Sequence, residues 1–218
     1  MNKNIFKISD QISIDEVEKI YEKNFEKIIY EFFNLEHEWM FNAYKEYKDF
    51  DKYLILIYLL HKTLETYNKH FYKVSFEKFY NNPHIEIEKI SIIDLVNSLS
   101  MSKETVRRKL NELSKEGVLT RKLKNIRINK VNSNARLERN VFNLSKLVFL
   151  LTSKLGKEHS LEDLSRLEIE KKIRNNYTQY WSLFFKFQIN YVLRCKNVYS
   201  SIETFYVWGL CAFNEALN

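Results

Sequence analysis

The sequence predicts a mostly α-helical protein. It contains 3 Gly and 1 Pro in 218 residues, too few of the turn-forming residues that an all-β or Rossmann-like fold needs. Apolar residues recur at helical spacing along most of the chain, and the hydrophobic fraction of 45% is enough to form a core. The length suits one large domain or two small ones. We therefore expect helices at both ends of the chain, flanking a short central module.

The N-terminal helical region is expected at residues 1–82. Ser13 and Glu16 have the spacing of a capping box, and an amphipathic pattern with helical period follows them. Residues 34–47 either extend this helix or begin another. Asp49 is placed to cap the next helix, whose apolar run is too short to cross a bilayer. We predict that this last helix is buried.

The central module contains two helix signals in close succession. Ser91 and Asp94 form a second capping box before a short helix. The motif "LSMS" then interrupts the period, and Ser102 is placed to cap another helix that extends to about Glu116. Gly117 follows, and glycine is the residue best suited to the left-handed conformation that ends a helix. The sequence thus predicts two short helices joined by a tight turn.

A two-stranded ribbon is predicted directly after these helices. "VLTRKL" and "IRINK" alternate in the manner of strands, and Lys124-Asn125 is a suitable turn between them. A further short strand, "HIEIEKI", is plausible after Pro83. Helix, turn, helix and ribbon is the plan of a winged helix-turn-helix. We assign the module to residues 83–131, with a recognition helix at 102–116 and a wing at 118–130.

The net charge of the chain, +7, is concentrated in this module. Residues 102–130 carry ten basic and three acidic residues, so the rest of the chain is neutral. A composition rich in Lys, Asn and Ile is also typical of an AT-rich genome, which raises the pI without any function. Such a bias would spread the excess charge, whereas a surface that binds a polyanion concentrates it. The placement favours nucleic acid as the partner.

The second helix of the module has an apolar and a polar side. At about 100° per residue, Val106, Leu110 and Leu113 share one side. The opposite side carries Glu104, Arg107, Arg108, Asn111 and Lys115. Arg and Lys bond guanine O6 and N7, Asn pairs with adenine, and Glu accepts from cytosine N4. We interpret the polar side as a surface that contacts bases in the major groove, with Lys109 at its flank, solvated or near a phosphate.

The stretch "MSKETVRRKLNELSKEGVL" resembles the recognition helix of bacterial winged-helix transcription regulators. Its "SKETVRR" core is similar to the Ser-Arg-Glu-Thr-Val-x-Arg pattern of the cyclic-AMP receptor family and to related stretches in GntR-type regulators. The resemblance implies that Lys103, Glu104 and Arg108 contact bases and that Thr105 meets a phosphate. Lys103 stands where that family has Arg, so one bidentate donor is missing.

The resemblance covers about 40 of the 218 residues, from Ile90 to Lys130. No cyclic-nucleotide pocket is predicted before it. A winged module with helices on both sides is instead similar in layout to MarR regulators, whose terminal helices form the dimer.

Together these observations give two sets of candidate site residues. The predicted base-contacting residues are Lys103, Glu104, Arg107, Arg108 and Asn111. The predicted phosphate-contacting residues are Ser102, Thr105, Lys115, Arg121, Lys122, Lys124 and Arg127. The base-contacting residues are expected to select the DNA sequence, and the phosphate-contacting residues to supply affinity.

The C-terminal region, residues 132–218, is predicted to contain further helices, one of them capped by Ser160 with Asp163. The last two are apolar around most of their circumference, so they must be covered. Polar residues such as Lys186 and Glu203 argue against membrane spans. The last two helices are expected to pack on each other, on the N-terminal helices or across a two-fold axis. We favour a homodimer, because specific DNA recognition usually uses two half-sites.

The C-terminal region is also rich in aromatic side chains, for which we favour a role in the core over a small-effector site. The cluster comprises Tyr177, Tyr180, Trp181, Phe184, Phe185, Phe205, Tyr206 and Trp208. Cys195 and Cys211 are expected to be buried thiols.

Other function classes find little support in the sequence. The five histidines lack metal-ligand spacing, no cofactor motif is present, and Glu36-His37-Glu38 is interpreted as a solvated helix face rather than an acid-base pair. We expect neither an enzyme nor a metal site. No signal peptide is predicted, so a cytoplasmic location is the expectation. Two alternatives stay open: a plasmid or phage replication or partition protein, and a winged-helix module that assembles with another protein.

Overall fold

The computed structural model of the protein is mostly helical, as predicted, with one small antiparallel sheet. It describes residues 12–81, 84–87, 89–122, 125–129, 134–159 and 164–216. The helices are α1 (Ile14–Lys23), α2 (Phe25–Tyr47), α3 (Phe50–Lys69), α4 (Phe76–Tyr80), α5 (Ile92–Leu99), α6 (Lys103–Lys115), α7 (Asn134–His159), α8 (Arg166–Asn175), α9 (Tyr177–Tyr199) and α10 (Ile202–Ala216). The strands are β1 (His84–Glu86), β2 (Leu119–Lys122) and β3 (Asn125–Asn129). Within the described ranges, no helix has both the length and the hydrophobicity needed to cross a bilayer.

The predicted helix starts are confirmed by their capping hydrogen bonds. Ser13 with Glu16 and Ser91 with Asp94 both form complete capping boxes. The Asp49 side chain accepts a hydrogen bond of 3.0 Å from the backbone N–H of the third residue of α3. These bonds satisfy N–H groups that have no partner within the helix, so short polar residues set where the helices begin.

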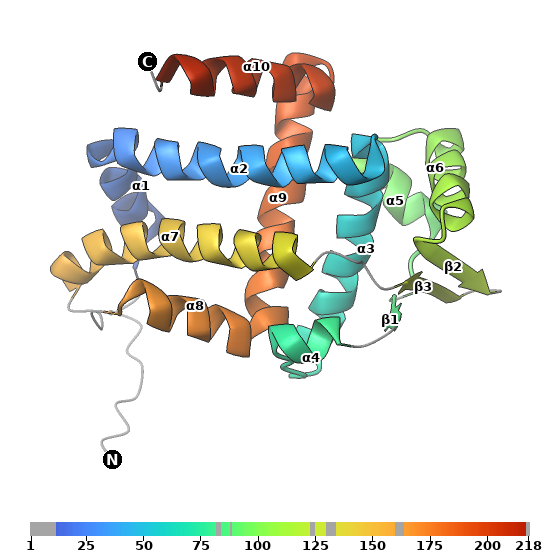
Figure 1. Ribbon diagram of the computed structural model, residues 1–218, viewed down its shortest axis with the longest axis horizontal. Coiled ribbons are helices and arrows are strands. Elements are labelled where there is room, and N and C mark those ends of the chain that lie inside the picture. Colours follow the sequence, from blue (N-terminus) through green and yellow to red (C-terminus); the bar gives the residue numbers. More distant parts are fainter. Residues whose placement is uncertain are drawn as a thin grey trace.

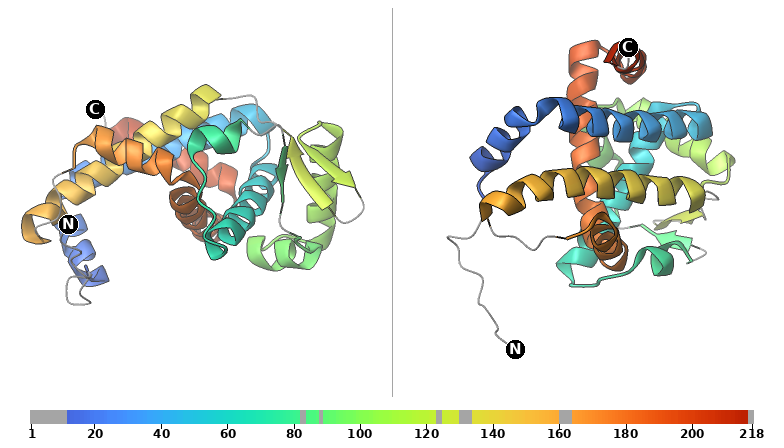
Figure 2. Two further views of the ribbon diagram at one scale, coloured as in Figure 1. Left: turned by 90° about the horizontal axis from the view of Figure 1, so that it is seen from below. Right: turned by 60° about the vertical axis from the view of Figure 1, so that its left-hand side comes forward.

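The helical body is built in two layers that cross each other. Helices α2, α7 and α8 lie side by side, and they pass across α9, which stands behind them (Figure 1). Helix α3 packs along α9, and α10 lies at one end of α9 and also contacts α2 (Figures 1 and 2). The winged module lies at one end of the body, away from α1 (Figure 1). It contains α5, α6, β2 and β3.

The core runs without interruption from the body into the winged module. On α9, Tyr177 and Trp181 are almost fully buried, and their rings stack with centroids 4.9 Å apart. The same cluster of buried side chains includes Leu95 of α5, Leu110 of α6 and Ile128 of β3. Because one core serves both parts, the position of α6 is tied to the packing of α3.

The winged module has the predicted order of elements. A tight turn joins α5 to α6, with Ser100 in the left-handed region at φ 50°. Gly117 follows α6 at φ 73°, as predicted. Strand β3 is the centre of the sheet and pairs antiparallel with β2 and with β1, where Ile85 lies opposite Ile128. The short strand predicted after Pro83 therefore adds a third strand to the wing.

Two predicted helix boundaries differ from the structure. The helix that starts after Ser13 breaks at Asn24, whose side-chain amide donates to the Ile20 carbonyl at 2.9 Å and so competes with the backbone ladder. Residues 34–47 continue α2. Helix α8 starts at Arg166, capped by Ser165 in a box with Glu168. The predicted caps Ser160 and Asp163 lie outside the described residues.

The two C-terminal helices are covered on one side only. In the aromatic cluster Trp181, Phe184 and Phe205 are core, as predicted, but Trp208 is 44% exposed. Leu183 on α9 is 61% exposed, so a single chain leaves part of the apolar surface of these helices uncovered, and packing across a two-fold axis stays a prediction. Cys195 is half-buried and Cys211 is exposed, so the prediction of two buried thiols fails for Cys211.

Glu36 is buried, not part of a solvated face. Its side chain accepts a hydrogen bond of 2.5 Å from Gln188 on α9, and the residue is 2% exposed. Burial raises the pKa of Glu36 to about 8, with the Gln188 bond acting in the opposite direction. Neighbouring His37 is half-buried beside Gly209 of α10, and desolvation lowers its pKa. The helical period of α2 does not predict the burial of Glu36 and His37, because it cannot show that α9 and α10 cover the polar side of this helix.

Candidate nucleic-acid interface

Helix α6 separates its apolar and polar residues onto opposite sides, as predicted. Val106, Leu110 and Leu113 are at most 1% exposed and pack into the core. The five predicted base-contacting residues are all exposed. Together with Glu112 and Lys115 they line a shallow, open hollow of about 700 Å³ on the surface of the module. The structure therefore brings these predicted residues together on one accessible face.

The start of α6 combines a helix cap with exposed hydroxyl groups. Ser102 accepts a hydrogen bond of 3.0 Å from the Thr105 backbone N–H, and its hydroxyl donates to the Thr105 hydroxyl at 2.9 Å. Ser102 is exposed and Thr105 is half-buried. A helix N-terminus carries partial positive charge, so this end of α6 attracts anions such as phosphates.

The wing contributes two exposed arginines, which the strand register places on opposite faces of the sheet. Arg121 of β2 is exposed and donates to the Asn111 side-chain oxygen of α6 at 3.3 Å, which joins wing and helix. Arg127 of β3 pairs with Glu86 of β1 at 2.7 Å and keeps 45% of its side chain exposed. Lys122 ends β2, but its side chain and the whole of Lys124 lie outside the described residues.

Lys109 is buried between α6 and α3, which corrects the prediction that it is solvated or near a phosphate. It is 7% exposed and pairs with Asp49, at the start of α3, and with Glu112 at 3.3 Å. Lys52 of α3 makes the reciprocal contacts, with Glu116 and with Glu112 at 3.4 Å. Buried cations need such partners, so these pairs fix how α6 sits on α3.

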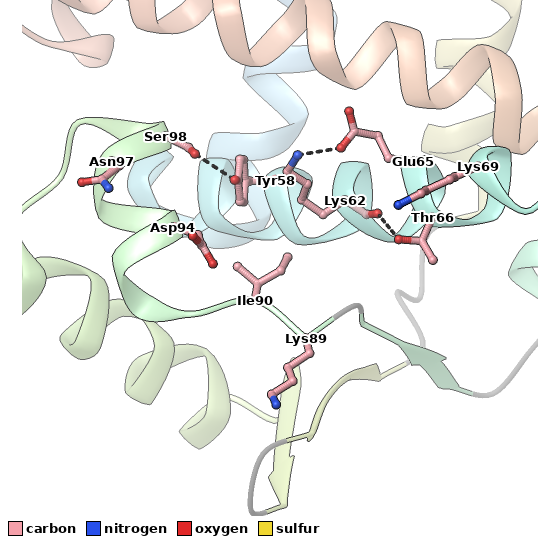
Figure 3. A pocket seen from close by; sticks show the side chains of 10 residues that line it. All are labelled: Tyr58, Lys62, Glu65, Thr66, Lys69, Lys89, Ile90, Asp94, Asn97 and Ser98. Carbon is pink, nitrogen blue, oxygen red and sulfur yellow. Dashed lines mark hydrogen bonds and ion pairs between the residues drawn. The ribbon is translucent and has the colours of Figure 1, made fainter.

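A second hollow, of about 690 Å³, lies between α3 and α5 and was not predicted (Figure 3). Its walls carry Lys62, Lys69 and Lys89, and Lys62 pairs with Glu65 at 2.6 Å. The Tyr58 hydroxyl and the Ser98 hydroxyl, 2.8 Å apart, join the two helices. Lys62 and Lys69 share a helix face by their spacing, but only the fold brings Lys89 to them.

The comparison with protein families now identifies the module. Residues 86–130 match the model of the DeoR-like helix-turn-helix domain. The matched range begins in β1 and takes in α5, α6 and the wing, so the DeoR-like domain coincides with the winged module. No curated protein and no solved structure matches the chain.

The DeoR-like domain supports a regulator that binds DNA through a winged helix-turn-helix. It points away from an enzyme, and the described residues contain no group of His, Cys, Asp or Glu arranged to hold a metal ion. The predicted resemblance to the cyclic-AMP receptor, GntR and MarR families is not confirmed by the match, which names another family.

Proposed function

We propose that the protein regulates transcription by binding double-stranded DNA at specific sequences, with α6 in the major groove and the wing on the phosphate backbone. The observation that carries this proposal is the exposed polar face of α6, backed by almost fully buried Val106, Leu110 and Leu113. A rigid helix with Arg, Asn and Glu on its outer side suits base contacts. Residues 83–131 form the DNA-binding unit in this proposal, between helical regions 1–82 and 132–218.

The two groups of candidate residues have different roles in this mechanism. Lys103, Glu104, Arg107, Arg108 and Asn111 select the sequence. Ser102, Thr105, Lys115 and the wing cations Arg121, Lys122, Lys124 and Arg127 hold phosphates. Phosphate contacts supply affinity without sequence information, whereas base contacts give discrimination.

Salt dependence tests the role of the proposed phosphate-contacting residues. Replacing Lys115 or Arg121 with Ala is expected to reduce the slope of log affinity against log salt by about 1 for each residue, because each loses one phosphate contact. The measurement is a titration of labelled duplex DNA at several salt concentrations. Replacing Lys171, an exposed cation of α8, is the matched control and is expected to leave the slope unchanged.

The same titration separates the alternatives. A winged-helix module that assembles with another protein would show no steep salt dependence and no base preference, and that result would exclude the proposed function. A plasmid or phage replication or partition protein would bind DNA with the same signature. Genomic sites recovered by immunoprecipitation distinguish the two, since a regulator is found at promoters and a replication protein at an origin.

We also propose that the protein acts as a homodimer through the exposed apolar side of the body. Helices α7, α8 and α9 surround an apolar groove of about 540 Å³, and its lining includes Val148, Ile173, Leu183 and Phe187. Leu183 and Phe187 are 61% and 47% exposed. A second copy would cover these side chains, and a contiguous exposed apolar surface is typical of protein interfaces. Two copies would supply the two half-sites of a specific DNA site.

Charge introduced into the groove tests the dimer. Leu183→Glu and Phe187→Glu are each expected to convert a dimer at micromolar concentration into a monomer, because an unpaired carboxylate would be buried at the interface. Sedimentation equilibrium measures the oligomeric state of each variant. Val198→Glu, at a 70% exposed apolar position of α9 that does not line the groove, is expected to remain dimeric. A monomeric unmodified protein would refute the dimer and leave the DNA-binding proposal standing.

A further inference from the structure

Glu112 of α6 lies at the boundary between the polar face and the buried ion pairs. One oxygen of its carboxylate, Oε1, accepts a hydrogen bond of 3.1 Å from Arg108, one of the proposed base-contacting residues. The other oxygen, Oε2, lies 3.3 Å from the Lys109 ammonium and 3.4 Å from the Lys52 ammonium. The carboxylate therefore faces the DNA-binding surface with one oxygen and the interior with the other.

The inner side of Glu112 is held by one cation from α3, Lys52, and by one from α6, Lys109. The side chains of Lys52 and Lys109 are 10% and 9% exposed, and each has a second carboxylate partner, Glu116 for Lys52 and Asp49 for Lys109. Asp49 also caps α3. Because both ammonium groups are fixed by these partners, the Glu112 carboxylate has little freedom to turn.

Glu112 stays ionised in this setting. Desolvation alone would raise the pKa of its carboxyl, but hydrogen bonds and charge from Lys109 and Lys52 outweigh it and lower the pKa. A charged acceptor holds Arg108 more strongly than a neutral one.

We propose that Glu112 is a positioning residue for sequence recognition: fixed to α3 by Lys52 directly and by Lys109 through Asp49, it orients the Arg108 guanidinium across the polar face of α6. This inference rests on the proposed function. The Arg108 side chain is 58% exposed, and a free arginine would sample many rotamers in solution. Its bond to Glu112 uses one of five N–H donors, so four others remain, and a bidentate contact with guanine needs only two of them. Ordering the side chain in advance lowers the entropy cost of that contact.

The position of α3 is part of this arrangement. Lys52 and Asp49 belong to the first turn and the cap of α3, and α3 packs along α9 in the body. A shift of α3 relative to α6 would move the Lys52 ammonium and also Asp49, the α3 partner of Lys109, and with them the orientation of Glu112 and Arg108. The body thereby influences which base is preferred.

Two matched substitutions test the inference. Glu112→Gln and Glu116→Gln each remove one negative charge and an ionic partner of Lys52, but only Glu112 contacts Arg108. Affinities are measured for the preferred duplex of the unmodified protein and for all its single-base variants. Glu112→Gln is expected to lower discrimination about 10-fold at one base pair, within the range for a bidentate contact. Glu116→Gln is expected to leave the base preference unchanged.

Arg108→Ala provides the reference background. In this background Glu112→Gln is expected to have no further effect on discrimination, because the residue that it orients is absent. A loss of discrimination that persists without Arg108, or an equal loss in Glu116→Gln, would overturn the inference.

A second variant tests the role of the Glu112 carboxylate if the Glu112→Gln protein does not fold. Lys52→Met removes one cation from Glu112 without contacting Arg108, and it is expected to weaken discrimination at the same base pair. Unchanged preference in this variant would also overturn the inference. If the unmodified protein shows no base preference on any duplex, the proposed function is refuted. This outcome differs from a refutation of the Glu112 inference, which requires that the unmodified protein has a base preference.

Discussion

Replacing both Arg107 and Arg108 with Ala is expected to reduce the affinity for the preferred DNA site by at least about 30-fold at moderate salt. A well-placed bidentate contact with guanine contributes about 1–3 kcal/mol, and two such contacts are lost together. Each ~1.4 kcal/mol corresponds to a tenfold change in affinity. Both residues are exposed on α6 and neither belongs to the core, so the variant is expected to fold normally. Fluorescence anisotropy with specific and unrelated duplexes measures both affinities.

The matched control removes the same charge elsewhere. Lys171 of α8 and Arg194 of α9 are exposed cations outside the winged module, and replacing both with Ala also lowers the net charge by two. This control is expected to keep the preference for the specific duplex. If it lowered specific affinity as much as the α6 variant, binding would depend on overall charge and not on α6.

Replacing Glu36 with Gln is expected to remove a large part of the pH dependence of folding stability. The pKa of Glu36 is about 8 in the folded protein, against an ordinary value of 4.5. Between these values the unfolded chain has released a proton that the folded chain retains. The free energy of unfolding therefore falls as pH rises through this range, and the loss is complete above pH 8. A fully buried carboxyl supplies a loss on the order of a few kcal/mol.

Urea denaturation between pH 5 and pH 9 measures this effect. A glutamine side chain resembles the neutral carboxyl in shape, so the Glu36→Gln variant is expected to match the unmodified protein at pH 5 and to exceed its stability above pH 8. Glu18→Gln, an exposed carboxyl of α1, is the control and is expected to retain the full pH dependence. A Glu36→Gln variant with the same pH dependence as the unmodified protein would show that Glu36 is ionised in the fold.

The winged module could be predicted well because its signals are local. The serine caps at Ser91 and Ser102, the glycine after α6 and the alternating strand patterns each depend on neighbours within a few residues. The angular separation of Val106 from Arg107 along one helix also follows from the helical period alone. For these reasons the polar face of α6 can be predicted from its own segment of the sequence, without knowledge of the neighbouring helices.

The burial of charged residues cannot be predicted from such local signals. The position of Lys109 at the flank of α6 predicts a side chain that is solvated or near a phosphate, yet it is buried against Asp49, a residue 60 positions away in the sequence. The amphipathic pattern around Glu36 predicts a solvated face, yet Gln188, 152 residues further along the sequence, donates a hydrogen bond to its buried carboxylate. A helical period gives the direction of a side chain but not how far a neighbouring helix reaches around it.

The sequence by itself determined the helical class, the starts of several helices and the face of α6 that carries the candidate DNA-contacting residues. Each of these depends on backbone hydrogen bonding and periodicity within one segment. Only the tertiary structure decided which charges are buried, which cations share a hollow and that Glu112 links Arg108 to α3. These depend on contacts between distant segments, where the cost of removing a charge from water is repaid only by a partner that the fold brings close.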